Sequence, residues 1–297
     1  MRNRMLLWLL LGGGAFVLLA VVALALVIAF AGVSGGDFAF GDRIQVVDVE
    51  GELVDSRPII EQLKRHEDNK SVRAILLNVD SPGGGVAVAQ EIHKEIKRLR
   101  EEKGKIIVAY MSSVGASGAY YISCPATRII ANPGTIVGSI GVIAEWVNYG
   151  DLLEWAKLKN VIFKTGEFKD TGTPTRPLTD REKAYFQGLI DDMYVQFVEA
   201  VADGRKLDVE RVRSLADGRV YTGREARAKK LIDEIGNFQD AVNLTASLAG
   251  ITGKPNLVRA TRQRVTLLDV LTGDVSRLNP FGAQSMKSQV RFQYLWK

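Results

Sequence analysis

Residues 74–101, AILLNVDSPGGGVAVAQEIHKEIKRLRE, place an apolar run, a glycine loop and a charged segment in direct succession. The run at 74–79 predicts a strand that is buried on both faces. The amphipathic segment at 86–101 predicts a helix. Because a strand followed directly by a helix is the repeating element of parallel sheets, this stretch predicts one βα unit of an α/β domain.

The same alternation continues on both sides of this unit. Short apolar runs rich in β-branched residues predict further strands, and amphipathic segments between them predict further helices. The alternation predicts repeated βαβ units and a mostly parallel sheet with helical cover. The additional strands are predicted at 43–49, 106–111, 129–131 and 161–165, and the additional helices at 58–65 and 152–157.

After Pro177 the pattern changes to helices. Thr179 with Glu182, and Thr222 with Glu225, fit a capping box at a helix start. The first box opens a long predicted helix, 180–201, with an apolar stripe for the core. From residue 254 the periodicity fades, which predicts a mobile or partner-dependent tail. The stripe consists of Phe186, Ile190, Met193, Phe197 and Val201.

Composition limits the classes of protein. The chain has 297 residues, of which 46% are apolar and 25% charged, as in folded proteins. Its single cysteine, Cys124, excludes an intrachain disulfide and a four-cysteine zinc site. Its two histidines argue against a histidine-rich metal site. We therefore expect no metal and no cofactor.

The N-terminal region predicts a membrane anchor. No ionisable side chain occurs between residues 5 and 36, and this run exceeds the roughly 20 residues that a membrane helix needs. A cleaved signal peptide is the alternative, because residues 29–31 resemble a cleavage site, but its apolar run would be shorter. Arg2 and Arg4 precede the run. They predict a single-pass protein of the cell membrane with a cytoplasmic N-terminus and an extracytoplasmic body.

The formal net charge of +5 is unevenly distributed. Residues 1–36 carry +2 and residues 254–297 carry +6, which leaves −3 for residues 37–253. A mildly acidic body removes the support for nucleic-acid binding that an overall basic chain suggests. We expect an anchor at 1–36, a catalytic domain at 37–253, and a basic tail at 254–297 that docks on anionic lipid or on the enzyme's own assembly.

Two glycine-rich loops follow predicted strands, where open α/β sheets place their sites. In the first, residues 81–85, consecutive glycines let backbone amides approach a ligand. The second, residues 114–121, contains Ser117 between small residues, as at a nucleophile elbow. Each loop alone is equally typical of a tight structural turn.

A nucleophilic serine needs a base. His66 and His93 lie in charged segments, which predicts solvated surface residues. Lys169 follows the strand predicted at 161–165, and a buried lysine can lose its proton if desolvation lowers its pKa by roughly 3 units. A solvated surface charge remains the alternative for Lys169. Ser139, in a third glycine loop, is either a hydroxyl that orients the amine or a turn residue.

Five motifs in order resemble the signal peptide peptidase A type of serine protease, a member of the ClpP/crotonase-fold superfamily. The resemblance covers roughly residues 43–249 and is greatest to the short form with one catalytic domain. One departure is Ala119, since members of the family often have glycine there. The motifs are SPGGG (81–85), GASGAYY (115–121), PGTIVGSIGV (133–142), GEFKD (166–170) and DGRVYTGREA (217–226).

The resemblance implies a role for each candidate residue. Ser117 would be the nucleophile, Lys169 the general base of a Ser/Lys dyad, and Ser139 the residue that orients the lysine. The backbone N–H groups of Gly84 and Gly118 would form the oxyanion hole. The implied substrates are remnant signal peptides and other short or unfolded peptides with small or apolar side chains near the cut. The implied assembly is a ring-like homo-oligomer, an octamer in the short forms.

Three alternatives remain open. A stomatin-partnered ClpP-class membrane protease would share the dyad, but usually has further membrane spans after the catalytic domain. A crotonase-like acyl-CoA enzyme would use the oxyanion hole for a thioester enolate. A non-catalytic membrane scaffold would keep the fold without activity. The pair of Ser117 and Lys169 argues against the last two.

Overall fold

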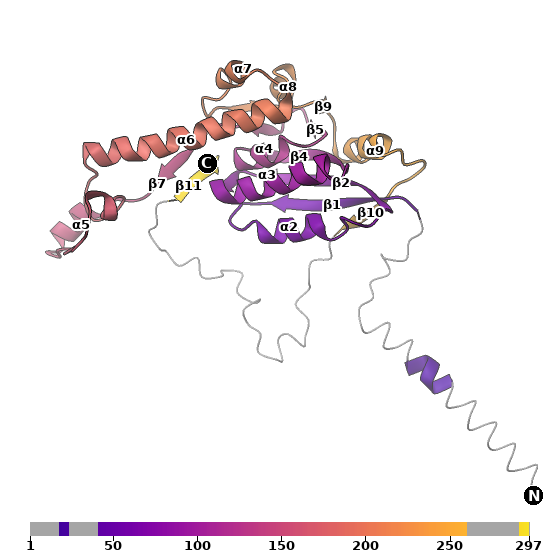
Figure 1. The fold of residues 1–297 in the computed structure, drawn as a ribbon, viewed down its shortest axis with the longest axis horizontal. Helices are drawn as coiled ribbons and strands as arrows, with labels where there is room; N and C mark the ends of the chain where they lie inside the picture. The colour runs from indigo at the N-terminus through magenta and orange to yellow at the C-terminus, as the bar shows by residue number, and fades with distance from the viewer. Residues whose placement is uncertain (1–17, 24–40, 260–290, 297) are drawn as a thin grey trace, which may run out of the picture. The chain divides into compact units, whose positions relative to one another are not determined.

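The structure, a computed structural model, describes residues 18–23, 41–259 and 291–296 (Figure 1). The membrane span expected within residues 5–36 lies outside this set, except for residues 18–23, which are helical. Among the described residues, no helix has both the length and the apolar character needed to cross a membrane. Asp42–Lys297 form one compact unit, and the following description concerns this unit.

A large sheet forms the centre of the unit. Its main path runs β10-β1-β2-β4-β5-β9, and every pairing along this path is parallel. β6 extends β4 in parallel, and β8 pairs with β6 in the antiparallel direction. The expected mixed α/β architecture with a mostly parallel sheet is therefore confirmed. The strands are β1 (Arg43–Glu50), β2 (Val72–Ser81), β4 (Ile106–Ala116), β5 (Arg128–Ala131), β6 (Ile136–Gly138), β8 (Val220–Thr222), β9 (Glu234–Ile235) and β10 (Asn256–Arg259).

Helices cover both faces of the large sheet. Residues of α3, α4 and α6 pack in one core with side chains such as Ile75 and Leu77 of β2. On the opposite face, α9 packs against a second set that includes Leu76. The alternation of strand side chains between two covered faces explains why β2 is apolar along most of its length. The helices are α2 (Arg57–Lys64), α3 (Val86–Glu101), α4 (Gly118–Ser123), α5 (Gly150–Trp155), η1 (Glu167–Asp170), α6 (Asp180–Arg205), α7 (Val209–Arg213), α8 (Gly223–Ala228) and α9 (Phe238–Leu248).

A second, small sheet joins distant parts of the chain. Its order is β3-β11-β7, with β3 at Gly83–Gly85, β7 at Ile143–Glu145 and β11 at Arg291–Leu295. The central strand β11 is antiparallel to both neighbours. The glycine loop predicted at 81–85 is thus an edge that the C-terminal segment covers.

Most predicted elements are confirmed, including both capping boxes, at Thr179 and Thr222. The strand predicted at 161–165 is wrong, because these residues form no strand and are exposed. An apolar run needs a neighbouring strand to become one, and here the described chain supplies none. The tail also differs from expectation, since β10 and β11 belong to sheets. Residues 260–290 lie outside the described residues.

Candidate active site

Ser117 stands at a strained junction between a strand and a helix. β4 ends at Ala116, α4 begins at Gly118, and Ser117 between them has φ 53° and ψ −118°. Residues other than glycine seldom adopt a positive φ, and such strain concentrates at functional sites. The side chain is almost completely buried, with 1% exposure. This is the geometry of a nucleophile elbow, which holds a serine in a fixed position.

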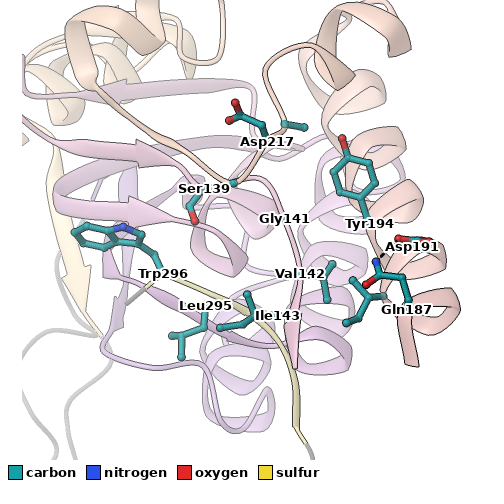
Figure 2. A pocket seen from close by; sticks show the side chains of 13 residues that line it. Ser139, Gly141, Val142, Ile143, Gln187, Asp191, Tyr194, Asp217, Leu295 and Trp296 are labelled. Atoms are coloured by element: carbon teal, nitrogen blue, oxygen red, sulfur yellow. Dashed lines mark hydrogen bonds between the residues drawn. The ribbon is translucent and has the colours of Figure 1, made fainter. Parts of the chain in front are cut away.

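Ser139 lies next to Ser117 because their strands pair. Ala116 of β4 is the register partner of Gly138 of β6, and the Ser117 N–H donates to the Gly138 carbonyl oxygen at 2.7 Å. Ser139 follows directly, with φ 51° and 7% exposure. It lines a cavity of about 580 Å³ (Figure 2). Tyr194 of α6 and Leu295 of β11 line the same cavity.

The glycine loop meets the serine junction without side chains in between. A Cβ on Gly83 would lie 2.6 Å from the Gly118 nitrogen and 2.0 Å from the Tyr294 carbonyl oxygen. A Cβ on Gly118 would lie 3.1 Å from the Gly84 nitrogen. Only glycine fits where backbone segments approach this closely. The structure therefore brings together Ser117, Ser139 and the backbone amides of Gly84 and Gly118.

The chain's own C-terminal strand lies along this loop in extended form. Tyr294 is the register partner of Gly84, and Leu295 of Gly83. The Trp296 N–H donates to the Pro82 carbonyl oxygen at 2.9 Å. Strand addition to an exposed sheet edge is how many proteins bind peptides. Sequence reasoning assigned no place in the site to these residues; the aromatic residues near the C-terminus were the available signal.

Lys169 is not among the residues that line the cavity beside Ser139. It is exposed in η1, and its side chain makes no hydrogen bond or ion pair with the residues that the structure describes. Its neighbour Phe168 packs on Tyr185 near the start of α6, with ring centroids 5.2 Å apart. Tyr121 of α4 instead packs on Phe197, 5.1 Å away. The twelve residues from Tyr185 to Phe197 span about 18 Å of helix.

The segment that carries Lys169, residues 146–176, is here called the arm. Figure 1 shows α5 of the arm near the N-terminal end of α6, away from the large sheet. Ion pairs fix the base of the arm to α6, since Arg176 binds Asp170 at 3.1 Å and Glu182 at 2.6 Å. The Arg176 guanidinium holds the pKa of the Glu182 carboxyl well below its usual range. Glu182 also closes the capping box at Thr179.

The histidines differ from expectation. His93 is half-buried, and its ring lies 4.8 Å from that of Tyr121. Burial lowers its pKa to about 4, so the imidazole is neutral at pH 7. The prediction that His93 is solvated is therefore wrong: its helix face turns toward α4 although its sequence neighbours are charged. His66 is also half-buried. In the described part of the chain, no three His, Cys, Asp or Glu side chains group closely enough to hold a metal ion.

Comparison with known proteins identifies relatives of this chain. A family model described as peptidase family S49 matches residues 99–252. A Synechocystis protein described as a candidate protease is 38% identical over 238 residues, which are 80% of this chain and 85% of the relative. An Enterococcus faecium protein described as a candidate signal peptide peptidase SppA is 37% identical over 65% of this chain and 56% of its own length.

A plant protein shows the same likeness. The chloroplastic serine protease SPPA of Arabidopsis thaliana is 31% identical over 226 residues, which are 75% of this chain and 35% of that protein. The family match includes the strained Ser117 junction and spans more than half of the chain. On these grounds the chain belongs to peptidase family S49, as a serine protease of the SppA type.

Proposed function

We propose that this protein is a membrane-anchored endopeptidase that degrades remnant signal peptides and other short or unfolded peptides with a Ser/Lys dyad. The observation that carries the proposal is the extended strand β11 on the glycine loop, beside the strained Ser117. A peptide substrate would lie as this strand lies. The anchor at residues 5–36, an extracytoplasmic catalytic domain and the ClpP/crotonase-type fold belong to the proposal. The parallel sheet and the glycine loops support that fold type.

The proposed chemistry combines the residues gathered at the loop with Lys169 from the arm. The Oγ of Ser117 attacks the scissile carbonyl carbon while its proton passes to the Nζ of Lys169. The N–H groups of Gly84 and Gly118 stabilise the oxyanion, and each donor of this kind contributes about 3 to 4 kcal/mol to the transition state. Lys169 then protonates the leaving amine as the C–N bond breaks. Water hydrolyses the acyl-enzyme, with Lys169 again as base.

We further propose that Lys169 acts on the Ser117 of a second copy of this chain. Within one chain Lys169 is exposed, and the arm packs on Tyr185 near the start of α6. The arm also exposes large apolar side chains, and exposed apolar patches of this kind mark interaction sites. Burial against a second copy would favour the neutral amine that a base needs. The exposed residues include Val147 at 75%, Leu152 at 60%, Trp155 at 81%, Val161 at 71% and Phe163 at 95%.

A ring-like homo-oligomer would allow the Lys169 of every copy to reach the Ser117 of a neighbouring copy. If each arm completes its neighbour's site, the contact is of the head-to-tail type, and a closed ring leaves no site incomplete. The octamer implied by the resemblance is one such ring. This part of the proposal rests on the exposed arm.

Cleavage of a quenched fluorescent peptide by the full chain in detergent tests the dyad. We expect Ser117→Ala and Lys169→Ala each to lower kcat by about 10⁴-fold or more, as removal of a nucleophile or its base does in serine proteases. Lys159→Ala is the matched control, because Lys159 is another exposed lysine of the arm. Full activity in both dyad variants would contradict the assignment.

Mixing the two inactive variants tests whether the base comes from a second copy. A chain with Ser117→Ala keeps its lysine, and a chain with Lys169→Ala keeps its serine. If the dyad forms between copies, co-assembled chains contain some complete sites and recover a measurable part of the activity. If it forms within one chain, every site lacks one member and the mixture stays inactive.

A further inference from the structure

A second cavity, of about 560 Å³, is lined by the C-terminal end of α6, by α8 and by residues in and before β9 (Figure 1). It shares no lining residue with the cavity of Figure 2. Most of its polar lining is basic, although residues 37–253 together carry a net charge of −3. Its volume is typical of sites for small molecules. The basic residues are Arg205, Arg224, Arg227 and Lys230, the one acidic residue is Asp233, and Ala228, Ile232 and Ile235 complete the lining.

Asp233 balances only one of these cations, because both oxygens of its carboxylate already have partners. Oδ1 pairs with the Nη2 of Arg205 at 2.8 Å, and Oδ2 accepts the Ile129 N–H at 2.7 Å. Glu225, the acidic residue of α8, is engaged in the capping box at Thr222. The other three cations of the cavity form no ion pair with the residues that the structure describes. Their charges therefore remain uncompensated around one cavity.

Arg205 is the buried member of this group. Its side chain is only 6% exposed. Asp233 is its one ion-pair partner in the described part of the chain, and its buried Nε–H has no acceptor there. A buried donor that stays unpaired is unfavourable, and more so when it belongs to a charged group. The Arg205 guanidinium is thus short of acceptors, and an oxyanion in the cavity that it lines would supply them.

Helix α8 brings two further guanidinium groups to the same cavity. Arg224, Arg227 and Ala228 are three and four positions apart, so they share one face of this helix. The Arg227 Nε–H donates to the main-chain oxygen of Asp233 at 3.1 Å, a neutral acceptor that leaves the charge of Arg227 in place. Arg224 and Lys230 are exposed, and their side chains form no hydrogen bond with the described residues. These two cations are therefore available to a ligand.

The uncompensated charge fits a phosphate group better than a carboxylate. A phosphate monoester carries about −1.5 to −2 charges at pH 7 and offers three strong acceptor oxygens. A carboxylate carries a single charge on two oxygens. Planar guanidinium groups bind phosphate oxygens in pairs. Ile232 and Ile235 line the cavity as well, which suits an organic group attached to the phosphate.

We propose that the cavity lined by Arg205, Arg224, Arg227 and Lys230 binds a phosphate monoester that carries a small organic group. A small soluble ester and the headgroup of a membrane lipid share this chemistry, and the arms of the experiment distinguish them. The site is separate from the proposed peptidase chemistry, since none of its residues belongs to the Ser117 junction or to the glycine loops.

Titration calorimetry of the full chain in a neutral detergent tests the site. The probes are glycerol phosphate, inorganic phosphate and acetate at equal ionic strength. We expect acetate to bind at least about tenfold more weakly than glycerol phosphate, because it offers less charge and fewer acceptors. Arg224→Ala with Lys230→Ala should weaken the binding of glycerol phosphate by roughly 10- to 100-fold. Equal affinity for acetate and glycerol phosphate, or an unchanged affinity in the double variant, would overturn the proposal.

Two further variants separate this site from the general charge of the chain. Arg73→Ala is the matched control, because Arg73 is an exposed arginine outside the cavity and without an ion pair among the described residues. It should bind glycerol phosphate within about twofold of the parent. Arg224→Lys keeps the charge and loses the planar fork, so its affinity should lie between those of the parent and the double variant. An equal loss in Arg73→Ala would contradict a defined site.

Hydrogen exchange of the α8 amides distinguishes the two sources of phosphate. The full chain is reconstituted with vesicles of phosphatidylcholine, with or without added phosphatidic acid, and then with glycerol phosphate instead. Slower exchange with phosphatidic acid, absent in the double variant, would identify a lipid headgroup, and slower exchange with glycerol phosphate alone would identify a soluble ester. If neither ligand slows exchange in the parent, the proposal is wrong. A smaller particle in sedimentation of the ligand-free double variant would assign the cavity to a second copy of the chain and would also overturn it.

Discussion

The Ser117 junction and the arm differ in how completely the chain itself packs them. Ser117 and Ser139 are at most 7% exposed and follow paired strands of the large sheet. The arm holds Lys169 beside side chains that are up to 95% exposed. One half of the proposed dyad is therefore set by the fold of a single chain. The other half depends on whatever covers the arm, so assembly and activity should be coupled.

Among variants outside the proposed dyad, the largest expected effect comes from charges placed on the arm. Trp155→Asp with Phe163→Asp puts two carboxylates on a surface that assembly would bury, and burial of an unpaired charge is strongly unfavourable. We expect smaller particles in sedimentation and a peptidase activity at least about 10³-fold lower, because isolated copies lack a base. Thermal unfolding of the isolated chain should change little, since both residues are exposed. Full activity in a monomeric variant would show that the arm does not act between copies.

A smaller loss is expected from a methyl group at the glycine loop. Gly83 has φ +100°, and a Cβ there would clash with two backbone atoms. Gly83→Ala should therefore displace the oxyanion amides and lower kcat by roughly 10²- to 10³-fold, while the oligomer stays intact. Gly134→Ala is the control, because nothing lies within 4 Å of its Cβ position. Equal activity of the two variants would show that the glycine loop does not contribute to the chemical step.

Releasing the C-terminal segment should raise activity at low substrate concentration. If β11 is docked nine-tenths of the time, the apparent affinity for short peptides is lowered about tenfold. Tyr294→Ala should then lower KM by about that factor. Steady-state kinetics over a wide range of peptide concentration would measure it. An unchanged KM would mean that the segment does not compete with substrate.

The smallest effect concerns the base of the arm. Arg176 holds the pKa of Glu182 below its ordinary value near 4.5, so the pair stabilises the arm above that pH and the contribution is lost as the pH falls. Glu182→Gln should weaken the arm by about 1 kcal/mol at pH 7, since Arg176 is partly exposed. Hydrogen exchange of amides in α5 would report this as roughly fivefold faster opening. Amides of β4 should be unaffected, and the difference between variant and parent should shrink below pH 4.5.

Local sequence patterns correctly predicted the features that depend on interactions between residues close together in the chain. The capping boxes at Thr179 and Thr222 formed because their partners are three residues away. The small residues around Ser117 predicted a sharp turn, and the turn is there. The roles of Ser117 and Lys169 came from the family resemblance and stay predictions. The strand predicted at 161–165 failed because composition alone does not supply a pairing partner.

Contacts between segments that are far apart in the sequence could not be predicted from local patterns. Nothing local to Tyr294 indicates that it pairs with Gly84, more than two hundred residues earlier. His93 was judged by charged sequence neighbours, whereas its environment is set by Tyr121 on another helix. The position of the arm relative to Ser117 likewise depends on the length of α6. Such features follow from tertiary packing, which overrides local propensity.

The small sheet has a consequence for which proteins the enzyme can attack. β11 is hydrogen-bonded on both edges, by β3 on one side and β7 on the other. A segment that replaces it must therefore offer two free backbone edges. A strand inside a folded protein has at least one edge already paired. In a helix, the backbone N–H and C=O groups are already hydrogen-bonded to each other. The small sheet would thus exclude folded proteins through backbone geometry alone, whatever their side chains.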